Sequence, residues 1–182
     1  MSLFEQIHAC NKCPLCQTRR NAVPGEGNPA ARLMLVGEGP GAEEDRLGRP
    51  FVGASGALLT ALLHEIGVER TETYIANVVK CRPPQNRTPT VSEANACLDY
   101  LRAQVSLVRP RVVLLRGGTA ARYVLGEDAR VRRDRGKWTR RGGIDMMVTY
   151  HPSALLRDPS LRRDAWADFK AVRDRLRELE AQ

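Results

Sequence analysis

Residues 32–41 read RLMLVGEGPG, an apolar run that passes directly into a turn of glycine, glutamate and proline. The run from Arg32 to Val36 is short and almost continuously apolar, which is typical of a strand buried on both faces of a parallel sheet. The glycines that follow allow the backbone to turn sharply. This stretch therefore indicates an α/β domain in which a polar turn follows a buried strand.

The same pattern recurs along the chain. Further short apolar strands are expected at Tyr74–Val79, Val112–Leu115 and Met146–Tyr150. Strands that alternate with helical segments predict a three-layer α/β/α sandwich with a central, mainly parallel four-stranded sheet. The length suits one hydrophobic core, so residues 1–182 are expected to form a single domain.

Helices are expected between these strands. One runs up to Ile66 and stops at Gly67, and another starts at the capping box formed by Thr90 and Glu93. The last begins at about Leu161. Prolines at both ends of the segment 82–89 predict a non-helical loop there.

Polar segments follow the strands where ligands bind in such folds. Ligands of open α/β sheets bind beyond the carboxyl ends of the strands. Three segments rich in glycine, proline or polar residues lie at such ends, at Gly37–Gly41, Asn77–Pro89 and His151–Ser153. Their convergence predicts the location of the functional site.

The net charge of +8 indicates a polyanionic partner. Only four of the 29 basic residues are lysine, and the arginine side chain suits phosphate, although a coding bias would produce the same ratio. No apolar run approaches the roughly 18 residues of a membrane span, and the first residues lack the pattern of a secretory signal. A cytoplasmic monomer is expected.

The five cysteines predict ligation rather than a disulfide framework, because their number is odd and the chain looks intracellular. Cys10 and Cys13 form a C-x-x-C pair, and Cys81 and Cys97 add two more thiols. Four thiolates can hold zinc or a [4Fe–4S] cluster. Cys16 extends the pair to a ferredoxin-like C-x-x-C-x-x-C, so the residues alone leave the ligand set open.

Three motifs, in order, resemble those of the family 4 uracil-DNA glycosylases, the iron–sulfur-containing, thermostable type. They are GEGPG–EED–GRPFVG within residues 37–53, NVVKCRPPQNR at residues 77–87 and HPSALLR at residues 151–157. The likeness covers nearly all of the chain. It implies an enzyme that flips uracil out of DNA, single- or double-stranded, hydrolyses its N-glycosidic bond and leaves an abasic site for base excision repair.

The resemblance also implies a [4Fe–4S] cluster held by Cys10, Cys13, Cys81 and Cys97. Cys16 falls where the family has no ligand. Glycosidic hydrolysis moves no electrons, so a structural role is expected for the cluster.

The uracil pocket implied by the resemblance contains an aromatic platform, an amide and a histidine. Phe51 is expected to stack on the base, and Asn77 to read its Watson–Crick edge. His151 is expected to stabilise the charge that develops at uracil O2. The turn backbone at Gly39 and Pro40 is expected to contact the same base.

Carboxylates and a second amide complete the expected site. Glu38 is expected either to position the attacking water or to stabilise the cationic sugar, and the sequence leaves both open. Glu44 is expected near uracil C5, where it would exclude the methyl group of thymine. Asn86 is expected to help hold water or DNA.

DNA contacts are expected beside the pocket. The segment Leu155, Leu156 and Arg157 is expected to fill the gap left by the flipped base. Lys80, Arg82 and Arg87 are expected to face phosphates. The basic run at residues 130–141 either adds phosphate contacts or is a solvated loop.

Other functions fit the residues less well. A non-catalytic iron–sulfur module that recruits partners to DNA explains the charge and the cysteines, but not the convergence of Glu38, Phe51, Asn77 and His151. A phosphate-handling enzyme is disfavoured because residues 37–41 lack a P-loop lysine and a third spaced glycine. A self-crosslinking relative carries an extra loop for which Asp45–Pro50 leaves no room.

Overall fold

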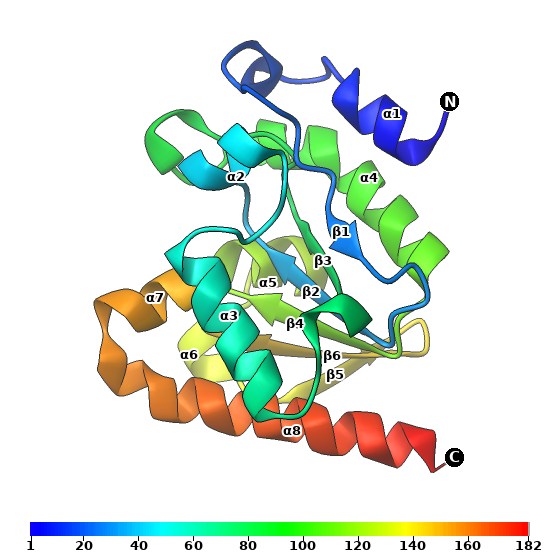
Figure 1. The fold of residues 1–182 in the computed structure, drawn as a ribbon, viewed down its shortest axis with the longest axis vertical. Coiled ribbons are helices and arrows are strands. Elements are labelled where there is room, and N and C mark those ends of the chain that lie inside the picture. The colour runs from blue at the N-terminus through cyan, green and yellow to red at the C-terminus, as the bar shows by residue number, and fades with distance from the viewer. Residues whose placement is uncertain (182) are drawn as a thin grey trace.

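The computed structural model describes residues 1–181, which build one mixed sheet of six strands in the order β1-β3-β2-β4-β6-β5 (Figure 1). The strands are β1 (Glu26–Gly27), β2 (Leu33–Gly37), β3 (Tyr74–Asn77), β4 (Val112–Arg116), β5 (Trp138–Arg141) and β6 (Ile144–Thr149). The inner strands β3, β2, β4 and β6 run parallel, and β1 and β5 pair antiparallel at the two edges.

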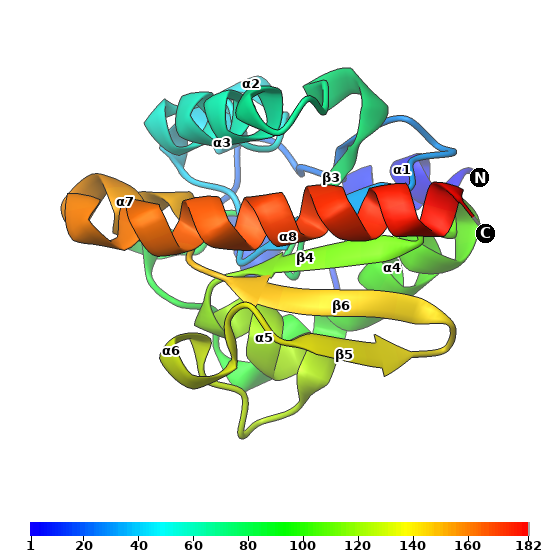
Figure 2. The same cartoon turned by 90° about the horizontal axis from the view of Figure 1, so that it is seen from below.

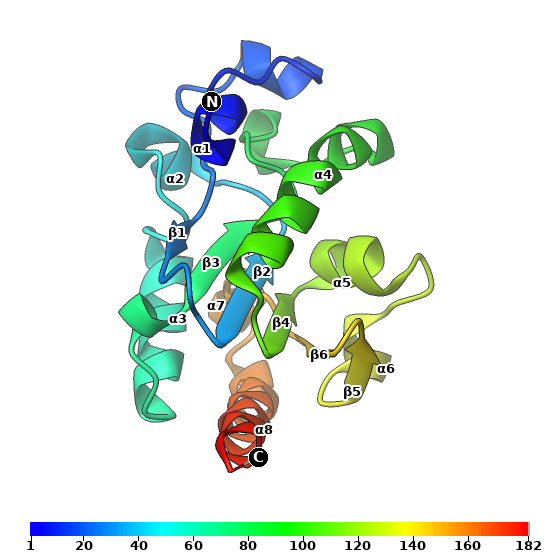
Figure 3. The ribbon, with the colours of Figure 1, turned by 90° about the vertical axis from the view of Figure 1, so that its right-hand side faces the viewer.

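Helices cover both faces of this sheet. They are α1 (Leu3–His8), α2 (Ala42–Leu47), α3 (Ala54–Glu65), α4 (Val91–Val108), α5 (Gly118–Leu125), α6 (Val131–Asp134), α7 (Pro152–Arg157) and α8 (Arg162–Glu180). Figure 3 shows α4 and α5 on one side of the sheet and α3 on the other, and α8 runs along that second side, above β4 and β6 in the view of Figure 2. The α/β class predicted from the sequence is therefore confirmed.

Strict alternation along the strands divides the core in two. In β2, Leu33 and Leu35 pack with α3 and α8, whereas Met34 and Val36 pack with α4 and α5. Every residue of β2 and β4 is buried, because helices cover both sheet faces. The same alternation determines which side of the sheet receives the last residue of each strand.

The expected count of four strands is wrong, because the sheet also has two antiparallel edge strands. β1 has only two residues, too few for any periodicity. β5 lies in the basic run at residues 130–141 and is largely exposed, so no apolar alternation marks it. Edge strands carry charged side chains because these discourage pairing with other chains.

The expected helices are present, and the structure adds a 3₁₀ turn and the short helices α2, α6 and α7. The Thr90 capping box is confirmed: its hydroxyl accepts from the Glu93 N–H at 3.2 Å, and the Glu93 carboxylate accepts from the Thr90 N–H at 2.8 Å. The loop after β3 contains one 3₁₀ turn at Pro84–Asn86, in which Gln85 has φ +55°. α2 was not expected. Acidic residues fill its first turn, where their negative charge interacts favourably with the helix dipole.

No helix within residues 1–181 has both the length and the apolarity that a membrane span requires.

Candidate active site

A cleft of about 780 Å³ opens beyond the carboxyl ends of β2, β3, β4 and β6. This volume is in the range of small-molecule sites. The polar segments singled out in the sequence meet here because parallel strands end at the same edge of the sheet. The expected site residues that line the cleft are Glu38, Gly39, Pro40, Glu44, Phe51, Asn77, Asn86, His151 and Arg157.

Phe51 lies in the cleft with a left-handed backbone, at φ +50°. Its ring centroid lies 5.6 Å from that of His151, with the two planes tilted by 42°. Glycine at position 37 leaves room for the ring, since a Cβ there would stand 2.6 Å from the Phe51 Cζ. The left-handed backbone of Phe51 costs a non-glycine residue of the order of 1–3 kcal/mol, so surrounding contacts must stabilise it.

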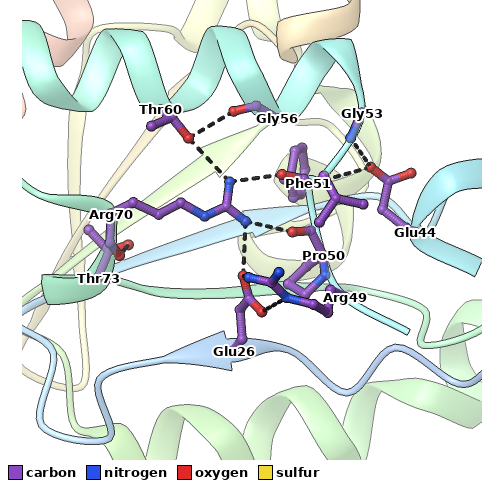
Figure 4. Close-up of polar contacts among 11 residues, drawn as sticks. Glu26, Glu44, Arg49, Pro50, Phe51, Gly53, Gly56, Thr60, Arg70 and Thr73 are labelled. Carbon is purple, nitrogen blue, oxygen red and sulfur yellow. Dashed lines mark hydrogen bonds and ion pairs between the residues drawn. The ribbon is translucent and has the colours of Figure 1, made fainter. Parts of the chain in front are cut away.

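Arg70 holds this loop from one side (Figure 4). Its guanidinium donates to the carbonyl oxygens of Pro50 at 2.6 Å and Phe51 at 2.8 Å. Glu26 accepts from Arg70 at 3.1 Å and from Arg49 at 2.8 Å, which fixes the guanidinium in turn.

Glu44 holds the loop from the other side (Figure 4). Its Oε1 accepts from the N–H groups of Val52 at 3.0 Å and Gly53 at 3.1 Å, and its Oε2 accepts from the Gly41 N–H at 3.1 Å. Both carboxylate oxygens therefore bind backbone, which joins the turn after β2 to the Phe51 loop. We call the contacts of Arg70 and Glu44 to residues 50–53 the Phe51 clamp.

Asn77 ends β3 and is 2% exposed. Its side-chain oxygen Oδ1 has no hydrogen-bond partner within the described residues. A Cβ at position 37 would stand 2.5 Å from this oxygen, so glycine is required beside it. A buried acceptor without a donor is rare in native proteins and indicates a group that awaits a ligand.

His151 caps the N-terminus of α7. Its Nδ1 accepts from the Ser153 N–H at 3.1 Å, so a neutral ring carries its proton on Nε2. Burial, together with the nearby cations Arg116 and Arg157, lowers the pKa of His151 to about 3. The imidazole is therefore neutral at pH 7 and presents an N–H donor.

Glu38 and Asn86 each have one side-chain oxygen engaged. The hydroxyl of Thr119, in the first turn of α5, donates to Glu38 Oε2. Asn86 Oδ1 accepts from Arg82 Nε at 2.7 Å. Thr119 was missed from the sequence; its signal is a hydroxyl directly after the glycine pair that ends the apolar strand β4.

Arg116 was also missed. It is the last residue of β4, is completely buried, and its Cζ lies 3.8 Å from the Phe51 ring centroid. Its three guanidinium nitrogens have no hydrogen-bond partner anywhere in residues 1–181. Burial, and then Arg70, lowers the pKa of Arg116 to about 9, so it stays charged at neutral pH. The available signal was an arginine that continues an apolar strand just before Gly117.

Two expectations for DNA contacts need correction. Leu155 is 1% exposed and belongs to the packing of α7, whereas Leu156 is 41% exposed. Lys80 is 1% exposed, and its ammonium donates to the Asn77 carbonyl at 2.7 Å and to Gln104 at 2.6 Å. Leu155 is therefore part of the core, and Lys80 cannot face phosphate.

Arg87 is tied to the protein rather than free. Its guanidinium forms a bidentate pair with Glu93, at 2.7 and 2.8 Å. This pair, with the Thr90 N–H, lowers the pKa of Glu93 to about 2. The loop after β3 is thus fixed to the start of α4.

The cysteines gather around a second, small cavity. It is lined by Cys10, Cys13, Cys16, Cys81 and Cys97, with Ile7 and Tyr100 among its walls. Cys81 accepts from the Arg19 guanidinium at 3.0 Å, and Cys97 accepts from the Lys80 backbone N–H at 3.3 Å. All five are free thiols. Within residues 1–181, no three acidic, histidine or cysteine side chains converge closely enough for a single metal ion.

Comparison with known proteins gives a consistent result. A family model described as the uracil DNA glycosylase superfamily matches residues 24–171. The chain is similar to the type-4 uracil-DNA glycosylases of Pyrobaculum aerophilum (47% identity over 92% of this chain and 89% of the relative) and Thermotoga maritima (46%, over 93% and 90%). It is also similar to that of Sulfurisphaera tokodaii (45%, over 93% and 81%).

Proposed function

The chain belongs to the uracil DNA glycosylase superfamily and is a type-4 uracil-DNA glycosylase of DNA repair; we propose that it hydrolyses the uracil N-glycosidic bond in the cleft beyond β2, β3, β4 and β6. The observation that carries this assignment is the unpaired Oδ1 of Asn77 beside the Phe51 ring and a neutral His151. Asn77 matches the base edge that carries both a donor and an acceptor, Phe51 matches the flat face of the base, and His151 matches the oxygen on which negative charge develops.

Recognition follows from Asn77 and Phe51. The extruded base stacks on Phe51, and Asn77 Oδ1 accepts from uracil N3–H while its amide N–H donates to O4. Cytosine presents the reverse pattern, with an acceptor at N3 and an amino donor at C4, so it would leave Asn77 unpaired. An unpaired buried group opposes binding, which makes the site selective.

Cleavage leaves the bonding electron pair on the uracil ring and positive charge on the sugar. The Nε2–H of His151 donates to uracil O2 as negative charge develops there, and it acts in a site shielded from water. The hydroxyl of Thr119 holds Glu38 Oε2, and Glu38 Oε1 orients the water that attacks C1′. Its negative charge also stabilises the cationic sugar. Asn86 helps to hold this water.

We propose that Leu156 and Arg157 fill the gap left by the flipped nucleotide. Leu156 is one of the few exposed large apolar side chains, and Arg157 lines the cleft rim. Gly39 and Pro40 flank the base through their backbone. The substrate is uracil-containing DNA, single- or double-stranded, bound by a monomer.

The cysteine cavity fits a [4Fe–4S] cluster held by Cys10, Cys13, Cys81 and Cys97. Its donors are all thiols, and two N–H groups point at sulfur, as is usual around such clusters. A cluster spreads its ligands more widely than one tetrahedral zinc, which agrees with thiols that do not converge on one point. When bound, the cluster supplies a structural crosslink between the N-terminal segment, the loop after β3 and α4.

Segments outside the matched residues 24–171 pack on the rest of the protein, which supports a single domain. α1 packs against α4, and α8, whose residues from 172 onward lie outside the match, packs against β4 and α3.

The direct test is excision from a fluorescent oligonucleotide with one uracil, followed by alkaline cleavage of the abasic site. We expect breakage with the wild-type protein and at least 100-fold slower breakage with His151→Ala and Glu38→Ala. An oligonucleotide with thymine at the same position is the control. A cluster-loaded protein that binds this DNA without breaking it would instead be a non-catalytic module.

A further inference from the structure

Arg116 is a buried charge that the reaction described above does not use. Its side chain is fully shielded from solvent, and its guanidinium nitrogens are unpaired within residues 1–181. An isolated buried cation is costly to a protein, because neither water nor an acceptor replaces its hydration. A nonpolar side chain would fit the strand better, so the charge calls for a functional explanation.

The position of Arg116 follows from the strand. Val112 and Leu114 face α3 and α8, so the next alternate residue, Arg116, faces the same side of the sheet. Asn77 reaches this side by the same alternation in β3, and the Phe51 ring packs there. The guanidinium is stacked on that ring, 3.8 Å from its centroid. Arg116 is among the residues that border the cleft, and its guanidinium covers one face of the Phe51 ring, which leaves the opposite, outer face for a base.

We propose that Arg116 is a positioning residue for uracil excision. Its guanidinium supports the Phe51 ring, and its positive charge stabilises, across that ring, the negative charge that develops on uracil. This inference rests on the proposed function of the cleft. Arg116 transfers no proton. The C1′–N1 bond breaks with its electron pair on N1, the water oxygen bonds to C1′, and the water proton is released on the Glu38 side.

The charge of Arg116 acts on the pocket because no carboxylate within residues 1–181 pairs with it. The charged group that acts on it most is Arg70, itself a cation, and His151 is neutral. A base stacked on the outer face would lie about 7 Å from the guanidinium, from the 3.8 Å spacing and a contact of about 3.5 Å. At an effective dielectric constant of about 20, the attraction at this distance corresponds to roughly 50-fold in rate.

The test compares Arg116→Met with Arg102→Met. Arg102 lies on α4 with a side chain 71% exposed and is not among the residues that line the cleft, so its replacement removes the same formal charge outside the site. In single-turnover reactions on uracil DNA, we expect Arg116→Met to be roughly 50-fold slower with DNA affinity changed less than about 3-fold. Arg102→Met should match the wild type. An Arg116→Met protein as fast as the wild type overturns the proposal.

Two further measurements separate charge from packing. 5-Fluorouracil is a more stable leaving anion, so the defect of Arg116→Met should shrink to a few-fold on that base. An equal defect on both bases would reduce Arg116 to a packing residue. Arg116→Lys keeps a cation without the planar stack and should recover part of the uracil rate.

The stability of the variants gives an independent readout. Removal of an unpaired buried charge should raise the Tm of Arg116→Met by about 3–10 °C. A slower but more stable protein is the expected signature, and it excludes misfolding as the cause. A wild-type protein that leaves uracil intact overturns the proposed function itself, whereas an active wild type with a fast Arg116→Met overturns only the role of Arg116.

Discussion

Among the single residues, Glu44 makes contacts that its expected role did not include. It was expected near uracil C5, and its two oxygens accept three backbone N–H groups, from the turn after β2 and from the Phe51 loop. Glu44→Ala should therefore slow uracil excision at least tenfold and lower the free energy of unfolding by about 2–3 kcal/mol, since charge-assisted bonds to buried backbone are lost. Glu44→Gln should retain part of both. Thymine excision by Glu44→Ala would show instead that this carboxylate screens C5.

His151 gives a prediction for the pH dependence of stability. Its folded pKa is about 3 against an ordinary 6.5, so below pH 6.5 the unfolded state takes up a proton that the folded state does not. Stability is therefore lost as the pH falls from 6.5 towards 3. Thermal melts of the wild type and His151→Asn should agree in trend above pH 7, and the variant should gain relative stability at pH 4–5. Parallel curves across this range would contradict a buried neutral imidazole.

At the level of elements, the Arg87–Glu93 pair fixes the loop after β3 to the first turn of α4. The pKa of Glu93 is about 2 against an ordinary 4.5, so this contribution is present above pH 4.5 and is lost as the pH falls towards 2. Arg87→Met should lower the urea midpoint at pH 7, because the buried Glu93 carboxylate loses its partner, and the effect should be modest because Arg87 is partly exposed. Urea unfolding at pH 7 and pH 3 measures this. Equal losses at both values would rule out an ionic contribution.

The elements also show how far the sequence leads. The four buried parallel strands were visible because continuous apolar runs end at glycine or polar turns. β1 and β5 were not, because one is too short and the other carries its charges on both faces. The expected pocket residues meet in one cleft, since strand ends are predictable from the runs themselves. Arg70, Thr119 and Arg116 were missed because their contacts join segments far apart in the chain, such as Thr119 with Glu38.

For the whole molecule, the cysteine cavity ties the first twenty residues to the sheet domain. Arg19 bridges the Cys81 sulfur and the His8 carbonyl, and the Tyr100 hydroxyl donates to the Gln6 carbonyl. Loss of the proposed cluster should therefore release this segment first. We expect Cys97→Ser to lose the iron–sulfur absorbance and to become sensitive to trypsin at Arg19 and Arg20. Cys16→Ser is the matched control, and equal iron loss from both variants would contradict the proposed ligand set.

The Phe51 clamp has a consequence for how the protein surveys a genome. Because Arg70 and Glu44 hold residues 50–53 from opposite sides, the aromatic platform is ordered when the chain folds and not anew at each encounter. Each extruded nucleotide then enters a preformed pocket, and a base other than uracil can stack back into the duplex without any rearrangement of the protein. Inspection should thus be limited by how often the duplex opens, so weakly paired or already open stretches would be examined most often.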